Sequence, residues 1–480
     1  MTAENRRAFP NLPQNIQKIH IIGIAGTAMG SLAAMLKSKG FDVRGSDKMA
    51  YPPMSTWLED QGIDIMIGYD EKNLDWNPDL VIVGNVCRSS YADAVAMRDR
   101  NIAHLSFPEA LRHFFMRRGN NIVVTGTHGK TTTTSLIAWS LFHAQRDPSF
   151  FVGGITGNFD SNFRLGQDPF VVEGDEYDTA YFDKVPKFWH YSPYRATINN
   201  IEFDHADIYP DLESVKHVFR RLVKLIPEYG TLWVNGDDAN ALEVSEERDC
   251  VRYTFGLGEG NHLRATDIEY GDVISCNVTF LEKDLGRFEL PMVGEFNLRN
   301  MLGAIGICLD ENVDPEVLKA GFKQFKSVKK RQELIAEVKG IKIFDDFAHH
   351  PTAVEATLSA MRKRFPNQKI WGIFEAKSNT SRRAVFQHDY PRALSIADQV
   401  VISKPWRKDE DLPPEKRLSI DQLVADIKDT GTPIELIENV DDIATYVAEH
   451  AQSGDIIVGL SGSSFGGLHQ KIVDRLNLTQ

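Results

Sequence analysis

The feature that most restricts the fold of this chain is a pattern that begins three times: a short apolar strand, then a loop, then a helical segment. It occupies residues 18–40, 120–142 and 340–365 of the 480 residues. Strands that alternate with helices predict parallel sheets covered by helices. We therefore expect an α/β protein of three domains in series, which suits a length of roughly 100–200 residues per domain.

These three starts define the predicted domains. Residues 18–115 form an N-terminal Rossmann-like domain, residues 116–330 a central domain with a parallel sheet and a phosphate loop, and residues 331–480 a C-terminal Rossmann-like domain. Residues 1–17 precede the first strand, and we expect them to form an arm.

The charge balance and the cysteines exclude several classes of protein. The chain has 54 Lys and Arg residues against 67 Asp and Glu residues, a formal net charge of −13. Such a chain repels a phosphate backbone, so we expect no nucleic-acid partner. Its four cysteines lie far apart, in no spacing typical of a disulfide framework or a thiolate zinc site. This pattern suits a reducing compartment.

No membrane segment is expected. Residues 1–17 place no apolar run behind their positive charges, so they do not resemble a secretory signal. The most apolar stretch, Ile19–Leu36, approaches the length of a membrane-spanning helix but contains His20, Gly23, Gly26 and Gly30. We expect a cytoplasmic protein with no membrane partner.

The strongest chemical signal is the segment TGTHGKTT at Thr125–Thr132. It directly follows a strand and opens a helix, so backbone N–H groups and the helix N-terminus can surround an anion. A Gly/Thr-rich turn without a ligand is the alternative, but the strand, loop and helix together favour a nucleotide phosphate loop. Lys130 would reach the terminal phosphates and the Thr131 hydroxyl a magnesium ion. The expected phosphate contacts are Gly126, Thr127, His128, Gly129, Lys130, Thr131 and Thr132.

This loop resembles that of the Mur ligase superfamily, ATP-dependent enzymes that build the peptidoglycan peptide. The segment EGDE at Glu173–Glu176 resembles the family's E-A-D-E motif, and NIEFDHAD, which contains His205, resembles N-I-E-x-D-H-x-D. The resemblance implies two magnesium sites, with Thr131, Glu173 and His205 as ligands. A histidine beside two aspartates would otherwise be a surface or capping residue.

The resemblance continues through the ATP site. It implies that Asn297 contacts adenine, although Phe296 stands where the family usually has histidine. Arg331 would close over the ATP phosphates. In the segment DDFAHHPT, Asp346 would meet the ribose and His349 would lie near the reacting groups. These residues could also simply cap the helix that begins near residue 351, and both roles are compatible.

The N-terminal glycine loop is ambiguous by itself. Gly23–Gly30 departs from the dinucleotide fingerprint, but an aspartate about twenty residues downstream would suit a dehydrogenase that binds NAD. By resemblance, this loop receives the diphosphate of UDP-N-acetylmuramate. The expected contacts are Gly23, Ala25, Gly26, Thr27, Met29, Gly30 and Asp47.

Two C-terminal segments, FEAKSNTSRR at residues 374–383 and GLSGSSFGGLHQK at residues 459–471, indicate the branch of the family. They resemble ligases that join the recycled tripeptide L-alanyl-γ-D-glutamyl-meso-diaminopimelate to UDP-N-acetylmuramate. Ala376 and Lys377 depart from the expected Pro-Arg. The expected peptide contacts are Ser378, Asn379, Thr380, Ser461, Ser463, Ser464, Phe465 and Gly466.

The predicted activity is therefore an ATP-dependent amide-bond ligase that works through an acyl phosphate, with Lys130, Glu173, His205 and His349 as catalytic residues. Two alternatives stay open: a UDP-N-acetylmuramate:L-alanine ligase of de novo synthesis, and a regulatory module that binds nucleotide without condensing substrates. We expect a monomer or a weak homodimer, and a third domain that swings onto the ATP site.

Overall fold

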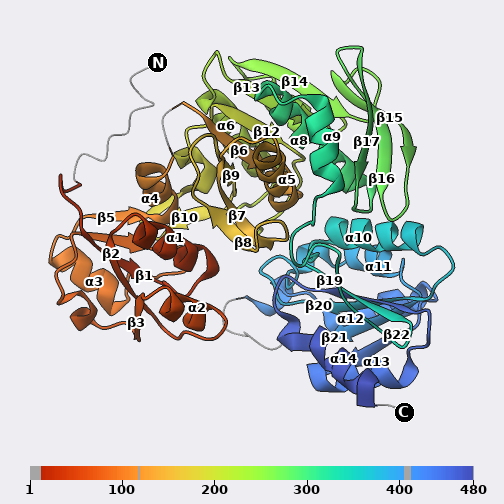
Figure 1. Cartoon of the computed structure of the whole chain (residues 1–480). Helices are drawn as coiled ribbons and strands as arrows, with labels where there is room; N and C mark the ends of the chain where they lie inside the picture. Colours follow the sequence, from red (N-terminus) through yellow and green to blue (C-terminus); the bar gives the residue numbers. More distant parts are fainter. Residues whose placement is uncertain (1–11, 117–118, 405–411, 479–480) are drawn as a thin grey trace.

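The computed structural model describes residues 12–116, 119–404 and 412–478, which contain three large sheets in succession and a two-stranded ribbon (Figure 1). The first belongs to residues 18–106, the second to residues 121–290 and the third to residues 333–460. The proposed domain boundaries fall in the connections between these sheets. Of the expected arm, residues 1–11 lie outside the described part of the chain.

The first sheet is Rossmann-like, with five parallel strands in the order β3-β2-β1-β4-β5. The strands are β1 (Lys18–Ile22), β2 (Asp42–Asp47), β3 (Asp64–Ile67), β4 (Leu80–Val83) and β5 (His104–Ser106). Its helices are α1 (Thr27–Ser38), α2 (Met54–Asp60), α3 (Ala92–Asp99) and α4 (Phe107–Phe114).

The central sheet has ten strands in the order β17-β16-β15-β14-β13-β12-β6-β9-β7-β8. Its middle is parallel, as predicted, but β15 to β17 and the β7–β8 pair are antiparallel additions. The strands are β6 (Asn121–Thr125), β7 (Ser149–Thr156), β8 (Ser161–Arg164), β9 (Phe170–Glu173), β12 (Arg195–Ile198), β13 (Thr231–Asn235), β14 (Val251–Gly256), β15 (Leu263–Glu269), β16 (Ile274–Phe280) and β17 (Lys283–Leu290), with β10 (Asp178–Ala180) and β11 (Asp183–Pro186) forming a separate ribbon. The helices are α5 (Lys130–His143), α6 (Leu212–Leu225), α7 (Ala239–Ser245), α8 (Glu295–Asp310) and α9 (Pro315–Lys323).

The third sheet has six strands in the order β18-β19-β23-β20-β21-β22, parallel except for the edge strand β18. The strands are β18 (Glu333–Val338), β19 (Ile341–Asp346), β20 (Ile370–Glu375), β21 (Gln399–Ser403), β22 (Ile434–Ile437) and β23 (Ile456–Leu460). The helices are α10 (Pro351–Arg364), α11 (Asp389–Leu394), α12 (Ile420–Asp429), α13 (Val440–His450) and α14 (Leu468–Leu478). The α/β fold of three units is confirmed.

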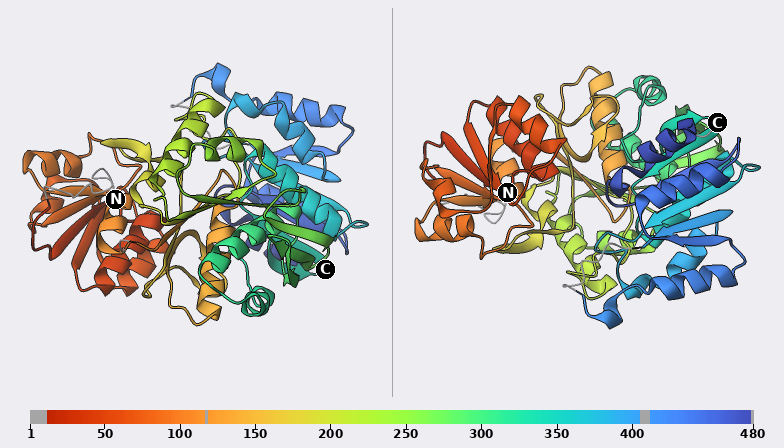
Figure 2. Two further views of the ribbon diagram at one scale, coloured as in Figure 1. Left: turned by 90° about the horizontal axis from the view of Figure 1, so that it is seen from above. Right: turned by 90° about the horizontal axis from the view of Figure 1, so that it is seen from below.

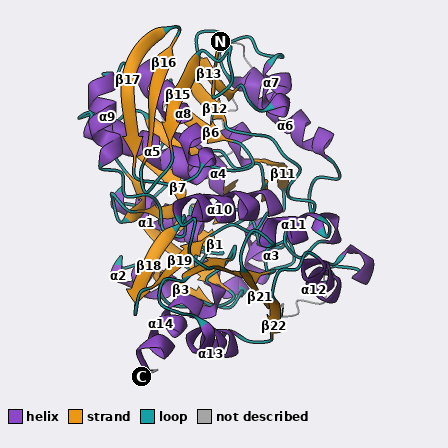
Figure 3. Cartoon of the chain, turned by 90° about the vertical axis from the view of Figure 1, so that its right-hand side faces the viewer, coloured by secondary structure: helices purple, strands orange, loops and turns teal. Residues whose placement is uncertain are grey.

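Burial explains why the strands are so apolar. Every residue of β4, β6, β20 and β23 is buried, because helices cover both faces of parallel sheets. Figures 1 and 2 show the N-terminal unit to one side of the central and C-terminal units. Figure 3 shows α10 between the strands of the central sheet above and β18 and β19 of the C-terminal sheet below. Among the described residues, no helix is long and apolar enough to cross a membrane.

Candidate functional site

The phosphate loop lies where β6 ends and α5 begins. Strand register brings Glu173, the last residue of β9, and Asn199, just after β12, to the same edge of the sheet. Gly126 and Gly129 have φ angles of 131° and 82°, which other residues rarely adopt. A Cβ atom at Gly129 would lie 2.2 Å from Asn300 Oδ1. The loop therefore needs glycine at this position for both conformation and space.

Lys130 projects into this loop and is held by its own backbone. Its Nζ donates to the Gly126 carbonyl at 2.6 Å and to both Glu176 oxygens at 3.0 and 2.8 Å. Burial alone would lower the pKa of Lys130, but the negative charges of Glu176, Asp175 and Glu173 outweigh it, and the pKa lies above its ordinary value. The ammonium group is thus charged and in place for an anion.

Two groups of possible cation ligands flank Lys130. Thr131 Oγ1 lies 3.0 Å from both carboxylate oxygens of Glu173, and Gly153 N also donates to Glu173. On the other side, one ligand atom each from Asp175, Glu176 and His205 lie within 4.8 Å of one another. Thr131, Glu173 and His205 thus lie beside the loop, as the sequence predicts.

His205 has a φ of 54°, a strained conformation that is typical of functional sites when the surroundings maintain it. Its Nε2 lies 3.2 Å from Glu176 Oε1. Burial opposes protonation of His205, but the hydrogen bond and charge of Glu176 prevail and raise its pKa. Glu176 therefore joins His205 to Lys130.

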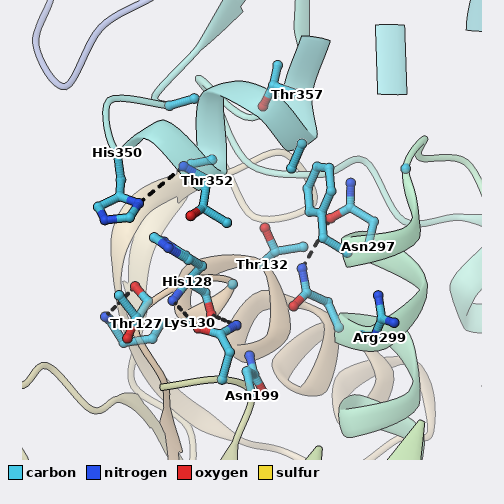
Figure 4. A pocket seen from close by; sticks show the side chains of 18 of the residues that line it. Thr127, His128, Lys130, Thr132, Asn199, Asn297, Arg299, His350, Thr352 and Thr357 are labelled. Carbon is cyan, nitrogen blue, oxygen red and sulfur yellow. Dashed lines mark hydrogen bonds between the residues drawn. The ribbon is translucent and has the colours of Figure 1, made fainter. Parts of the chain in front are cut away.

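A cavity of about 670 Å³ extends from this loop to the C-terminal unit. Figure 4 shows Lys130 and Thr132 of α5 below, Asn297 and Arg299 of α8 to one side, and Thr357 of α10 above. Arg331, Asp346 and His349 also line it. The structure therefore brings the predicted ATP-site residues of the two units together around one space.

Some of the side chains that line the cavity already form hydrogen bonds within the protein. Asn297 Nδ2 donates to Val293 O at 2.8 Å, and its Oδ1 accepts from Asn300. The Asp346 carboxylate accepts from Gln332 N, Ala348 N and Thr357 Oγ1. Both residues therefore support local structure. Contacts from them to adenine and ribose stay predictions, and Phe296 beside them also lines the cavity.

His349 is neutral in this setting. Burial lowers its pKa, and its Nδ1 lies 2.9 Å from the Phe347 carbonyl. A carbonyl can only accept, so Nδ1 carries the proton and Nε2 holds a lone pair. Arg331 stacks its guanidinium 4.9 Å from the Phe347 ring, and its Nη2 lies 3.5 Å from Thr131 Oγ1. The C-terminal unit thus reaches the phosphate loop.

Hydrogen bonds hold the two units in this closed arrangement. Thr380 Oγ1 donates to Asp204 Oδ1 at 2.6 Å, and Asn379 Nδ2 donates to Asp207 and to Tyr177 OH. Both Thr380 and Asn379 were predicted peptide contacts. Here they connect the C-terminal unit to the loop that carries His205.

The other predicted peptide residues surround Glu375 at the end of β20. Ser461 Oγ and Ser463 Oγ donate to Glu375 Oε2 at 2.5 and 2.7 Å, and Ser378 bonds Ser381. Phe465 is buried, so its side chain is packed in the core, while Ser464 is exposed and Gly466 has a φ of 56°. Ala376 is buried, and Lys377 Nζ lies 3.5 Å from Glu375 Oε1.

The N-terminal glycine loop contributes no residue to the cavity. Its exposed part, Gly26 to Ala28, opens α1, while Met29 and Gly30 are buried. Ala25 N donates to Asp47 Oδ2 at 2.9 Å, and Gly23 has a φ of 83°. Asp47 thus lies at the loop, as predicted.

Sequence reasoning missed several residues that line the cavity or contact Lys130 and His205 beside it. Glu176 lies three residues after Glu173 in the same motif, and Glu202 and Asp204 precede His205 in theirs, so motif spacing could have indicated them. His128 Nε2 lies 3.2 Å from Glu202, and the His350 ring is 5.0 Å from that of His128. No local pattern predicts that last contact, because it joins two sheets.

Comparison with known protein families identifies the three units. Residues 18–118 match the model of the "Mur ligase family, catalytic domain", residues 124–308 that of the "Mur ligase middle domain", and residues 330–463 that of the "Mur ligase, glutamate ligase domain". The chain belongs to the Mur ligase family.

Several relatives resemble this Mur ligase over almost their whole length. The UDP-N-acetylmuramate–L-alanyl-γ-D-glutamyl-meso-2,6-diaminoheptandioate ligase of Escherichia coli K12 is 37% identical over 96% of this chain and 98% of its own. The UDP-N-acetylmuramate–L-alanine ligase of Alkaliphilus metalliredigens is 32% identical, over 94% and 96%. The crystal structure of a murein peptide ligase from Psychrobacter arcticus matches with a TM-score of 0.73 and 31% identity, over 96% and 99%. The family prediction is confirmed, and the chain is a ligase.

Proposed function

We propose that this ligase joins the tripeptide L-alanyl-γ-D-glutamyl-meso-diaminopimelate to UDP-N-acetylmuramate, with ATP converted to ADP and phosphate. The observation that carries the proposal is the sequence identity over nearly the whole chain. It is 37% with two ligases that have these substrates in their names and 32% with an L-alanine ligase. The cavity beside the phosphate loop supports the use of ATP.

The chemistry explains the need for Lys130. A carboxylate is a poor electrophile, so it first attacks the γ-phosphate and forms an acyl phosphate, which the amine then attacks with loss of phosphate. Negative charge spreads over the transferring oxygens, and a positioned ammonium stabilises it. Glu176 binds Lys130 in this structure, so the phosphates of ATP would compete with Glu176 for the ammonium group.

The residues beside the loop fit magnesium. Thr131 and Glu173 offer a hydroxyl and a carboxylate, and Asp175 and Glu176 add carboxylates next to His205. Such oxygen-rich sets suit Mg²⁺. Bound there, the ions would neutralise phosphate charge and orient the oxygens. We assign Thr131 and Glu173 to one site and His205 to a second.

His349 has the properties of a proton acceptor for the second step. Its Nε2 lone pair belongs to a buried, neutral ring that lines the cavity. We assign it to removal of a proton from the attacking amine after the C–N bond begins to form. Arg331 and the phosphate-loop residues Gly126 to Thr132 would bind ATP phosphates, with Asn297 and Asp346 towards the nucleoside.

The remaining assignments concern the substrate-binding loops, the cellular compartment and the oligomeric state. The exposed N–H groups that open α1 would bind the diphosphate of UDP-N-acetylmuramate, and the loops around residues 378–380 and 461–466 would bind the tripeptide. We further propose a cytoplasmic monomer or weak homodimer with no nucleic-acid or membrane partner.

Phosphate release tests this function. Full-length protein receives ATP, Mg²⁺ and UDP-N-acetylmuramate, with either the tripeptide or L-alanine as the amine. Release with the tripeptide supports the proposal. Release with L-alanine alone would assign the chain to de novo synthesis, and no release with either would contradict both.

A further inference from the structure

A further cluster of metal-ligating side chains lies beside the phosphate loop and shares no residue with the cluster that contains His205. It consists of His128 in the phosphate loop, Glu202 after β12, and His350 at the start of α10. One ligand atom from each lies within 4.8 Å of the others. His128 and Glu202 belong to the central unit and His350 to the C-terminal unit, so the cluster spans the closed interface (Figure 4).

The distances are close to those of a metal site. His128 Nε2 lies 3.2 Å and His350 Nδ1 3.9 Å from the same oxygen, Glu202 Oε2. Tetrahedral zinc with bonds of about 2.0 Å separates its ligand atoms by about 3.3 Å. The 3.2 Å between His128 Nε2 and Glu202 Oε2 matches this separation, and the 3.9 Å between His350 Nδ1 and Glu202 Oε2 exceeds it by about 0.6 Å.

Each ligand is also oriented by bonds outside the cluster. His350 Nε2 lies 3.2 Å from the Phe203 carbonyl, which fixes the proton on Nε2 and leaves Nδ1 as an acceptor. In this structure Nδ1 accepts from Thr352 N at 3.3 Å and lies 3.9 Å from Glu202 Oε2, so a metal ion would take the place of the Thr352 N–H. Asn200 Oδ1 accepts from His128 N at 2.8 Å, and Thr127 Oγ1 accepts from Glu202 N at 2.9 Å. The bond of His350 Nε2 is a typical outer-shell contact of a metal ligand, and the other two bonds hold the backbone of His128 and Glu202 in place.

The ligand set selects the metal. Two imidazoles and one carboxylate favour zinc and similar transition metals, whereas Mg²⁺ prefers oxygen ligands. Three protein ligands leave a fourth position for water or an anion. We propose that this ligase binds one Zn²⁺ at His128, Glu202 and His350, distinct from its magnesium sites, and that the ion tethers the C-terminal unit to the phosphate loop.

A tether would oppose the opening that releases products. Zinc should therefore inhibit turnover even in excess Mg²⁺, an expectation that also rests on the proposed function. Binding and closure do not depend on that function, so they are measured separately.

The first experiment titrates full-length protein with ZnCl₂ in excess MgCl₂ against a chromophoric zinc chelator. We expect one tight equivalent, weakened more than about 100-fold in His128→Asn and His350→Asn. Asparagine at position 350 keeps an N-cap for α10, which favours folding. The matched controls His205→Asn and His190→Asn change the other two histidine–carboxylate clusters found among the described residues, and they should retain the affinity for zinc.

The second experiment compares melting temperatures and phosphate release with and without ZnCl₂. Zinc should raise the melting temperature of the wild type and inhibit its phosphate release, and both effects should be lost in His350→Asn. Three results would each overturn the site. They are no tight zinc binding by the wild type, a zinc affinity of the position-128 and position-350 variants equal to that of the wild type, or a loss of zinc affinity in His205→Asn alone. Binding without a higher melting temperature would overturn the tether. Inactivity of the zinc-free wild type would contradict the proposed function alone.

Discussion

The N-terminal glycine loop (residues 23–30) and the phosphate loop (residues 126–132) both follow a strand of a parallel sheet and open a helix, α1 and α5. Their charges differ. The phosphate loop holds Lys130 among Glu173, Asp175 and Glu176, whereas the N-terminal loop offers backbone donors with Asp47 as the neighbouring acid. A helix N-terminus suffices to recognise a diphosphate, but phosphoryl transfer also needs a positively charged side chain and metal ligands.

The largest expected effect tests the difference in charge between the two loops. Lys130→Met should lower kcat about 1,000-fold, because it removes a charge that stabilises the transferring phosphoryl group. KM for UDP-N-acetylmuramate should stay unchanged, since we propose that this substrate binds the other loop. Steady-state phosphate release measures both, with Lys72→Met on the exposed surface as the control. A loss below tenfold would contradict the comparison.

Backbone conformation gives the next effect. In Gly129→Ala the new Cβ meets Asn300 Oδ1 at a residue with a positive φ, a strain of about 2 kcal/mol. We expect the loop to shift and relieve this strain, which would disturb its phosphate contacts and lower ATP affinity by up to roughly 30-fold. Nucleotide binding by calorimetry measures the affinity. Unchanged ATP affinity would show that the loop keeps its conformation and bears the strain.

In the N-terminal loop, Asp47→Asn should raise KM for UDP-N-acetylmuramate about tenfold, because it weakens the charged hydrogen bond that orients Ala25 N. KM for ATP should not change. A lower KM for UDP-N-acetylmuramate would show instead that the carboxylate competes with the diphosphate.

The smallest effect is a control within the same loop. Gly26 has a φ of −69°, and a Cβ there would come no closer than 3.5 Å to Gly23 O. Gly26→Ala should therefore leave the melting temperature nearly unchanged and change both KM values by less than about twofold. A large rise in KM for UDP-N-acetylmuramate alone would place the diphosphate directly against this residue.

Much of the site could be predicted because its motifs are local. Thr125–Thr132 and Glu173 lie at the ends of adjacent parallel strands, and an apolar strand before a glycine loop is visible in the sequence. The roles of Thr380 and Asn379 could not be predicted the same way. Their partners Asp204 and Asp207 lie more than 170 residues away, and only closure of the units brings them together.

The sequence by itself determined the three α/β units, the phosphate loop and the resemblance to the Mur ligases, because strand periodicity, glycine conformation and helix N-termini act within a few residues. Only the tertiary structure decided that Glu176 joins Lys130 to His205, that Asp346 supports its own loop, and that His350 meets His128 and Glu202. These contacts depend on how sheets and helices pack against one another, and burial and charge in the resulting cavity then set the protonation of each group.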